Sequence, residues 1–254
     1  MFFTYFLIAI FATVLGSLAG LGGGVIIKPI LDTLGHYDLS TVGVLSSITV
    51  FSMALVSTFK QIKSGFKIEL SMIILSLGSI LGGGIGKTIF DFFLTLFVDQ
   101  SLGKGIQALI IALLLLAVLF KNKLPKYHIK NNLIIFVVGI FLGTIASFLG
   151  IGGGPINVAV LIMFFSFSTK NAAISSVFII LLSQLSKILL IALTTGFSSY
   201  NLKMLPFMVI GGISGGFIGA SLNKKLKNKQ IEKIFNISVI SIILLNIYNA
   251  YISF

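Results

Sequence analysis

Two glycine-rich stretches interrupt the most apolar parts of the chain. The first extends from Gly20 to Gly24 and the second from Gly150 to Gly154, a step of 130 residues. A glycine-broken hydrophobic segment at matching positions of two halves indicates an internal duplication, with the broken segments at its functional centre. The same step relates three further pairs, which are Ser46 and Ser176, Gly82 and Gly212, and Gly86 and Gly216.

The composition places the duplicated halves in a membrane. Of the 254 residues 57% are hydrophobic and only 9% are charged. Runs of about 20 apolar residues are what a membrane-spanning helix needs, because lipid forces every backbone polar group to be satisfied within its own segment. The chain is therefore predicted to be an all-α polytopic membrane protein. It has no cysteine, which excludes disulfides and thiolate chemistry.

The apolar runs divide the chain into two repeats of the same plan. Residues 1–120 form the first transmembrane repeat, 121–131 a basic cytoplasmic linker and 132–254 the second repeat. In the first half a broken run over 3–34 precedes spans at 41–59, 68–89 and 104–120, with a loop from Asp91 to Gly103 that contains Asp91 and Asp99. In the second half a broken run over 133–167 precedes spans at 172–193, 204–222 and 234–251.

Three lysine clusters predict the orientation of these segments. They lie at residues 60–67, 121–130 and 224–229, and lysine in short loops marks the cytoplasmic side. All three clusters lie inside only if the second broken run enters the membrane and returns as two half-length helices, and we apply the same interpretation to the first broken run. Each half is then a glycine-hinged hairpin plus three full spans. An odd number of full crossings makes the second half inverted, with both termini outside.

The hinges are predicted to bind an anion. A helix that begins at Gly24 or Gly154 points unpaired N–H groups and the positive end of its dipole toward the hinge. Intramembrane lysines are rare and functional by default, and Gln184 and Lys187 share one helix face. No cofactor or metal is expected. The predicted substrate-binding groups are Gly22, Gly23, Gly24, Gly152, Gly153, Gly154, Lys28, Ser46, Ser47, Asn157, Ser175, Ser176, Gln184 and Lys187.

These features resemble the sulfite exporter TauE/SafE family of small bacterial membrane proteins. The resemblance is carried by the glycine stretch and proline between Gly20 and Pro29, by Gly150 to Gly154, and by the repeat plan along nearly the whole chain. It implies secondary transport of a small sulfur-containing anion, such as sulfite, thiosulfate or an organosulfonate. The implied location is the bacterial plasma (inner) membrane. The sequence departs from the family pattern at Pro155, directly after the second glycines, and at Lys28.

Other classes of protein find less support in the sequence. No glycine-rich run ends in Gly-Lys-Ser/Thr, which argues against ATP-driven transport by this chain. No nucleophile and base suggest an enzyme. The net charge of +12 belongs to cytoplasmic loops and not to nucleic-acid binding. Two alternatives remain, an anion channel of the same fold and a non-transporting membrane scaffold. Glycines four residues apart, such as Gly78 and Gly82, are expected to be packing faces.

Overall fold

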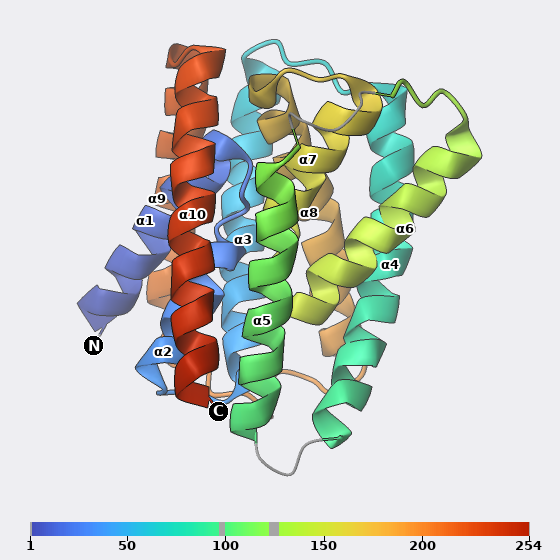
Figure 1. Ribbon diagram of the computed structural model, residues 1–254. Coiled ribbons are helices and arrows are strands. Elements are labelled where there is room, and N and C mark those ends of the chain that lie inside the picture. Colours follow the sequence, from blue (N-terminus) through green and yellow to red (C-terminus); the bar gives the residue numbers. More distant parts are fainter. Residues whose placement is uncertain (1, 97–99, 122–126, 254) are drawn as a thin grey trace.

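The computed structural model describes residues 2–96, 100–121 and 127–253. Within these residues the chain is helical and contains no strand (Figure 1). The helices are α1 (Phe2–Ala19), α2 (Gly24–Leu34), α3 (Leu39–Lys63), α4 (Leu70–Thr95), α5 (Gln100–Leu119), α6 (Asn132–Leu149), α7 (Gly154–Phe165), α8 (Thr169–Leu193), α9 (Leu205–Lys225) and α10 (Asn228–Ser253). The predicted all-α class is confirmed.

Helix length separates the described helices into two groups. Eight of them are long and apolar enough to cross a membrane, and α2 and α7 are not, with 11 and 12 residues. The prediction that both limbs of each hairpin are half-length is wrong. The first limbs, α1 and α6, have 18 residues each, or about 27 Å of helix against about 16 Å for α2. Both first limbs continue to their glycines because no earlier residue breaks the helix.

The glycine hinges turn the chain between the two limbs. Gly20, Gly22 and Gly23 have φ between 71° and 82°, and the corresponding glycines of the second hinge have φ between 66° and 75°. These angles lie in the left-handed region, where a Cβ is costly. A Cβ built on Gly24 would lie 2.8 Å from the Ile151 carbonyl oxygen, and one on Gly154 would overlap Leu21. The two hinges therefore pass each other in direct contact.

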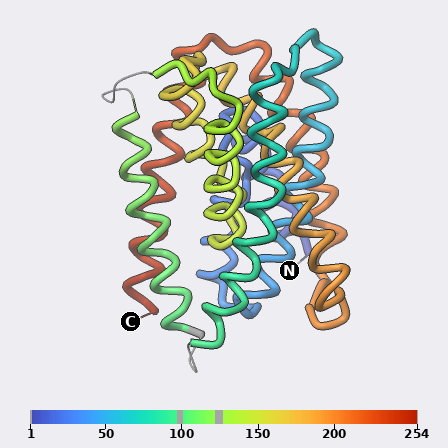
Figure 2. Tube along the Cα trace, turned by 90° about the vertical axis from the view of Figure 1, so that its right-hand side faces the viewer, coloured from blue at the N-terminus to red at the C-terminus, as the bar shows by residue number. Residues whose placement is uncertain are grey.

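The helices of each half pack mainly against helices of the other half. Helix α1 packs along α9 of the second half, whereas α6 packs along α4 of the first half. In the same way α3 contacts α9, α8 contacts α4, and α10 and α5 cover α2 and α7. Helices α5 and α10 lie side by side at one edge of the bundle (Figure 2). This exchange is what two equivalent repeats would produce.

Glycines let these helices approach closely. A Cβ on Gly78 would lie 3.1 Å from the Gly139 Cα, and one on Gly143 would lie 2.7 Å from the Ser79 Cα. Between α9 and α1, a Cβ on Gly219 would lie 2.5 Å from the Val14 carbonyl oxygen. Such close backbone contact is typical of small residues four apart in membrane helices. The predicted packing role of these glycines is confirmed.

Side-chain amides from neighbouring helices cap the C-terminal ends of α1 and α6 at equivalent positions of the two repeats. The Leu18 carbonyl accepts a hydrogen bond from the Asn223 side-chain amide at 2.7 Å, and the Phe148 carbonyl accepts one from Gln107 at 3.1 Å. Leu18 and Phe148 are 130 positions apart, the step of the duplication. The last carbonyls of a helix have no intrahelical donor. Buried amides from neighbouring helices therefore satisfy both ends.

Several predicted boundaries are wrong because helices extend into the predicted loops. Asp91 was expected in a loop, yet α4 continues to Thr95. Lys87 lies one turn before Asp91 and pairs with it, so both charges are compensated within the helix. The predicted basic turn at 60–67 is helical as far as Lys63. Asp99 and linker residues 122–126 lie outside the described residues.

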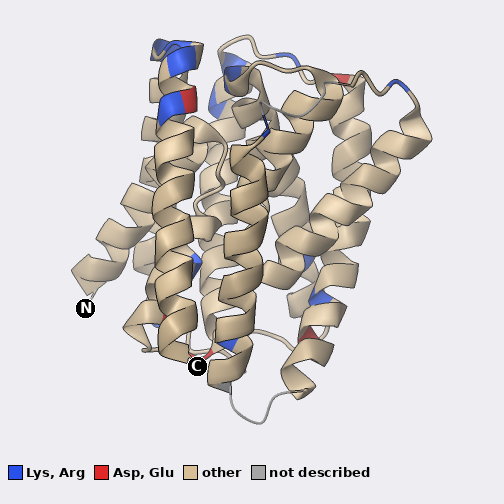
Figure 3. Ribbon diagram, in the orientation of Figure 1, with Lys and Arg blue, Asp and Glu red and all other residues tan. Residues whose placement is uncertain are grey.

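The charges are distributed unevenly along the bundle. Lysines gather at the end where α3 and α9 finish and α10 begins, at the top of Figure 3. The N- and C-terminal parts of the chain lie nearer the other end of the bundle, away from these lysines (Figures 1 and 3). This arrangement is the one that the predicted hairpins require.

Single-cysteine labelling would test this orientation. The natural chain has no cysteine, so each variant carries one reactive group. Lys225→Cys and Lys63→Cys should react with an impermeant thiol reagent from the cytoplasmic side, and Tyr251→Cys from the outside only. All three side chains are exposed. Reaction of Lys63→Cys and Lys225→Cys from opposite sides would contradict the hairpin topology, because the α6–α7 run would then cross the membrane instead of returning.

Candidate functional site

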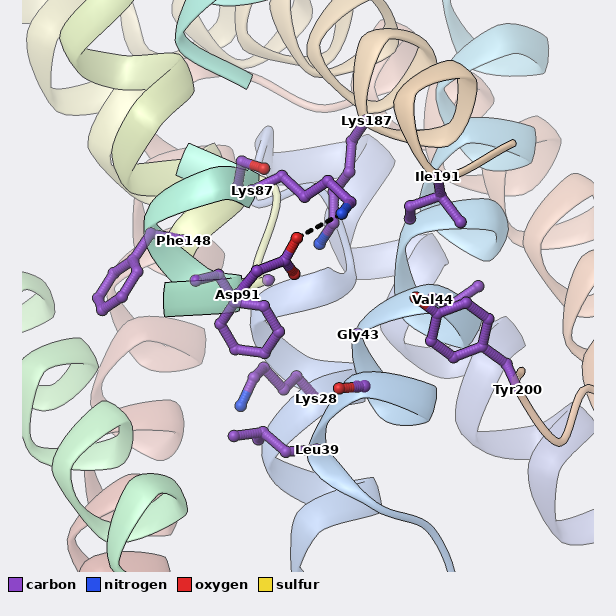
Figure 4. Close-up of a pocket in the computed structure, with 14 residues that line it drawn as sticks. Lys28, Leu39, Gly43, Val44, Lys87, Asp91, Phe148, Lys187, Ile191 and Tyr200 are labelled. Carbon is purple, nitrogen blue, oxygen red and sulfur yellow. Dashed lines mark hydrogen bonds and ion pairs between the residues drawn. The ribbon is translucent and has the colours of Figure 1, made fainter. Parts of the chain in front are cut away.

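Three buried lysines from three helices converge on one pocket. Lys28 on α2, Lys87 on α4 and Lys187 on α8 all line it, and as whole residues they are 2%, 5% and 5% exposed. Figure 4 shows the Lys87 and Lys187 side chains ending beside the Asp91 carboxylate, with Lys28 below them. The cavity has a volume of about 30 Å³, which is room for about two water molecules.

The pocket carries an excess of positive charge. Lys28 pairs with Asp32 at 3.0 Å, and Lys87 pairs with Asp91. Within the described residues, Lys187 makes no hydrogen bond or ion pair with another group. Three lysines and two aspartates leave a net charge of +1. A buried charge is costly unless it is paired, so the Lys187 ammonium is the group that a bound anion would stabilise most.

Two glycines provide the space that the lysine side chains fill. A Cβ on Gly43 would lie 4.0 Å from the Lys187 Nζ atom. A Cβ on Gly150, in the second hinge, would lie 3.5 Å from the Lys28 Cδ and Cε atoms. Lys28 itself lies one turn after the start of α2 at Gly24. The first hinge therefore positions Lys28, and the second hinge forms part of the wall that it packs against.

The structure places the predicted lysines and the predicted hinge glycines in different positions. Lys28 and Lys187 line the pocket. The predicted hinge glycines, Gly22 to Gly24 and Gly152 to Gly154, lie beside it where the two hinges cross. Gln184 lies near that crossing, with its Nε2 atom 3.8 Å from a Cβ built on Gly152.

Three of the predicted serines have structural hydrogen bonds. Ser47 and Ser175 donate to carbonyls of their own helices, at Gly43 and Asn171. Ser176 donates to the Gly20 and Gly154 carbonyls at 2.7 and 3.2 Å, and so joins the two hinges. Bonding to the helix backbone is the usual role of a serine inside a span.

Three other polar atoms near the hinges are buried and have no hydrogen-bond partner among the described residues. These atoms are the Ser46 hydroxyl, the Ser147 hydroxyl and the Asn157 side-chain carbonyl. Ser147 lines the lysine pocket, and a Cβ built on Gly24 would lie 3.1 Å from the Ser46 Oγ atom. Buried polar groups are nearly always hydrogen-bonded. These unsatisfied hydrogen-bonding groups lie near the N-termini of α2 and α7, and this arrangement is consistent with a polar ligand.

Sequence reasoning missed two charged members of the pocket, Lys87 and Asp91. Lys87 lies inside the span predicted at 68–89, so the rule that singled out Lys187 also applied to it. Asp91 was assigned to a loop, which hid its i, i+4 relation to Lys87. Tyr200 also lines the pocket. It comes from the loop before α9, and no sequence signal could have placed it there.

A multispanning helical protein with a buried cationic pocket beside glycine hinges has the architecture of a solute transporter. Comparison with known proteins agrees with this class. The profile of the family described as "Sulfite exporter TauE/SafE" matches residues 5–246. The chain belongs to this family of membrane transporters.

Two curated relatives carry names of the same kind. The probable membrane transporter protein YunE of Bacillus subtilis is 29% identical over 259 residues, covering 92% of this chain and 93% of the relative. A probable membrane transporter protein of Methanocaldococcus jannaschii is 24% identical over 236 residues, covering 86% and 85%. The similarity therefore extends over both halves of the chain.

Proposed function

We propose that this protein is a secondary transporter that moves a small sulfur-containing anion across the bacterial plasma membrane. The single observation that carries the proposal is Lys187, a lysine 5% exposed that lacks a partner within the described residues. It lies in a pocket with two further lysines. The family supports sulfite, thiosulfate or an organosulfonate as the substrate class.

Electrostatics favours an anion over a cation. A desolvated ammonium attracts an anion far more strongly than an exposed one, because little water screens the pair. Asp91, which lines the pocket, and Asp32 beside it are each paired with a lysine, so their negative charges are already compensated. The N-termini of α2 and α7 add partial positive charge near the hinges. Ser46, Ser147 and Asn157 could contribute hydrogen bonds to the same anion.

Alternating access is the mechanism that this arrangement supports best. Lys28 and Lys87 belong to the first half and Lys187 to the second, so the pocket lies between the halves. The exchanged packing of α1 with α9 and of α6 with α4 supports an inverted repeat, in which one half rocks against the other. The cavity is smaller than a hydrated anion needs, so loading requires such a motion.

Flux through purified protein in liposomes tests the proposal. Sulfite, thiosulfate, sulfate, methanesulfonate and acetate would each be offered as a labelled solute. We expect saturable uptake of at least one sulfur anion and little uptake of acetate. Single-channel currents carried by these anions would instead support the alternative that the protein is an anion channel of the same fold. Folded protein that moves none of these solutes would remove the transport proposal and favour the scaffold.

A further inference from the structure

We propose that Asp91 is a tethered counter-ion of Lys87 that the substrate displaces, and that this competition sets the affinity and selectivity of the pocket. The inference rests on the proposed anion transport. It assigns a specificity-determining role to Asp91, whose carboxylate pairs with Lys87 when no substrate is bound.

The two lysine–aspartate pairs of the pocket differ in exposure. In both pairs the aspartate follows its lysine by four residues on the same helix. The Lys28 and Asp32 side chains are 2% and 9% exposed, so this pair is enclosed. The Lys87 side chain is 7% exposed, but that of Asp91 is 51% exposed. Both partners of the first pair are therefore buried, whereas one partner of the second pair is half exposed.

This difference decides which pair can open. If the Asp91 carboxylate turns away from Lys87, it gives up less burial than Asp32 would, because half of its surface is already free of protein contacts. Asp32 has no such freedom, and its departure would leave two charges buried and unpaired. Lys87 stays buried when Asp91 leaves. It then requires another anion, and the substrate can supply it.

The position of Asp91 fits this exchange. It lines the same pocket as Lys87 and Lys187 (Figure 4), and it lies one helical turn beyond Lys87, at the end of α4 that lacks the lysine clusters. With Asp91 turned outward, the Lys87 and Lys187 ammonium groups both face the cavity. The incoming anion then meets two unpaired cations in place of one.

A double-mutant cycle with Asp91→Asn and Lys87→Gln tests the competition. Binding of thiosulfate and of sulfite to the purified protein would be measured by titration calorimetry. In Asp91→Asn we expect Kd to fall by about tenfold, a coupling of the usual size between interacting sites. In the Lys87→Gln background the same change should leave Kd within about twofold, since the carboxylate no longer has a lysine to block.

Two controls separate displacement from a general gain of positive charge. Asp32→Asn alters the pocket charge by the same amount, and we expect no comparable gain in affinity from it. Asp91→Glu keeps a tethered carboxylate and should therefore show none of the gain in affinity expected for Asp91→Asn. Because Asp91 is half exposed and asparagine has its shape, Asp91→Asn should fold, which a thermal melt of each variant would verify.

The outcomes distinguish this inference from the proposed function. An unchanged Kd in Asp91→Asn, or a gain that persists without Lys87, would overturn the displacement while leaving anion transport intact. An equal gain in Asp32→Asn would also overturn it, because charge alone would then explain the effect. If neither the wild type nor any variant binds a sulfur anion, both proposals fail.

Discussion

Replacement of Lys187 by glutamine is expected to reduce the initial rate of sulfur-anion uptake by about hundredfold. Loss of one partner of a buried charge pair costs about 2–5 kcal/mol, and this variant removes the pocket lysine that has no ion pair with any described aspartate. The rate would be measured in liposomes at a substrate concentration below saturation. Lys203→Gln is the matched control, because Lys203 is an exposed lysine in the loop before α9.

The stability of the Lys187 variant distinguishes loss of binding from loss of folding. An unpaired buried ammonium destabilises the empty protein, and glutamine is a neutral side chain of similar length. The melting temperature of Lys187→Gln without substrate should therefore equal or exceed that of the wild type. A variant that transports within about threefold of the wild type would contradict a central role for Lys187.

Replacement of Gly154 by alanine is expected to destabilise the fold by about 2–3 kcal/mol, as overpacking of a close contact does. A Cβ at this position overlaps the Leu21 backbone and lies 2.6 Å from the Gly20 carbonyl oxygen. The hinges would have to separate, which would also strain the Ser176 bonds to both of them. The melting temperature in detergent and the yield of monodisperse protein should both fall.

Gly84→Ala is the control for this change. Gly84 is also helical, but its added Cβ would meet only the Leu190 Cδ2 atom at 3.9 Å. Alanine forms helices better than glycine, so this variant should be at least as stable as the wild type. Equal stability of Gly84→Ala and Gly154→Ala would show that the hinges are not in tight contact.

Much of the fold could be predicted because it follows from local sequence. Apolar runs predicted the spans, and the duplicated glycines predicted where the chain turns. Local sequence does not report which partner a side chain meets. Ser176 corresponds to Ser46 in the repeat, yet Ser176 joins the two hinges, whereas Ser46 has no hydrogen-bond partner among the described residues. The pocket likewise depends on how α2, α4 and α8 come together, so only Lys28 and Lys187 of its charged groups were foreseen.

The most direct test of the central proposal is calorimetric titration of the purified wild-type protein and Lys187→Gln with sulfite, thiosulfate, sulfate and methanesulfonate. The proposal predicts saturable binding of at least one of these anions by the wild type, with an affinity reduced by about hundredfold in the variant. Binding of the same anion with equal affinity by both proteins would contradict it, because the anion would then occupy a site other than the lysine pocket.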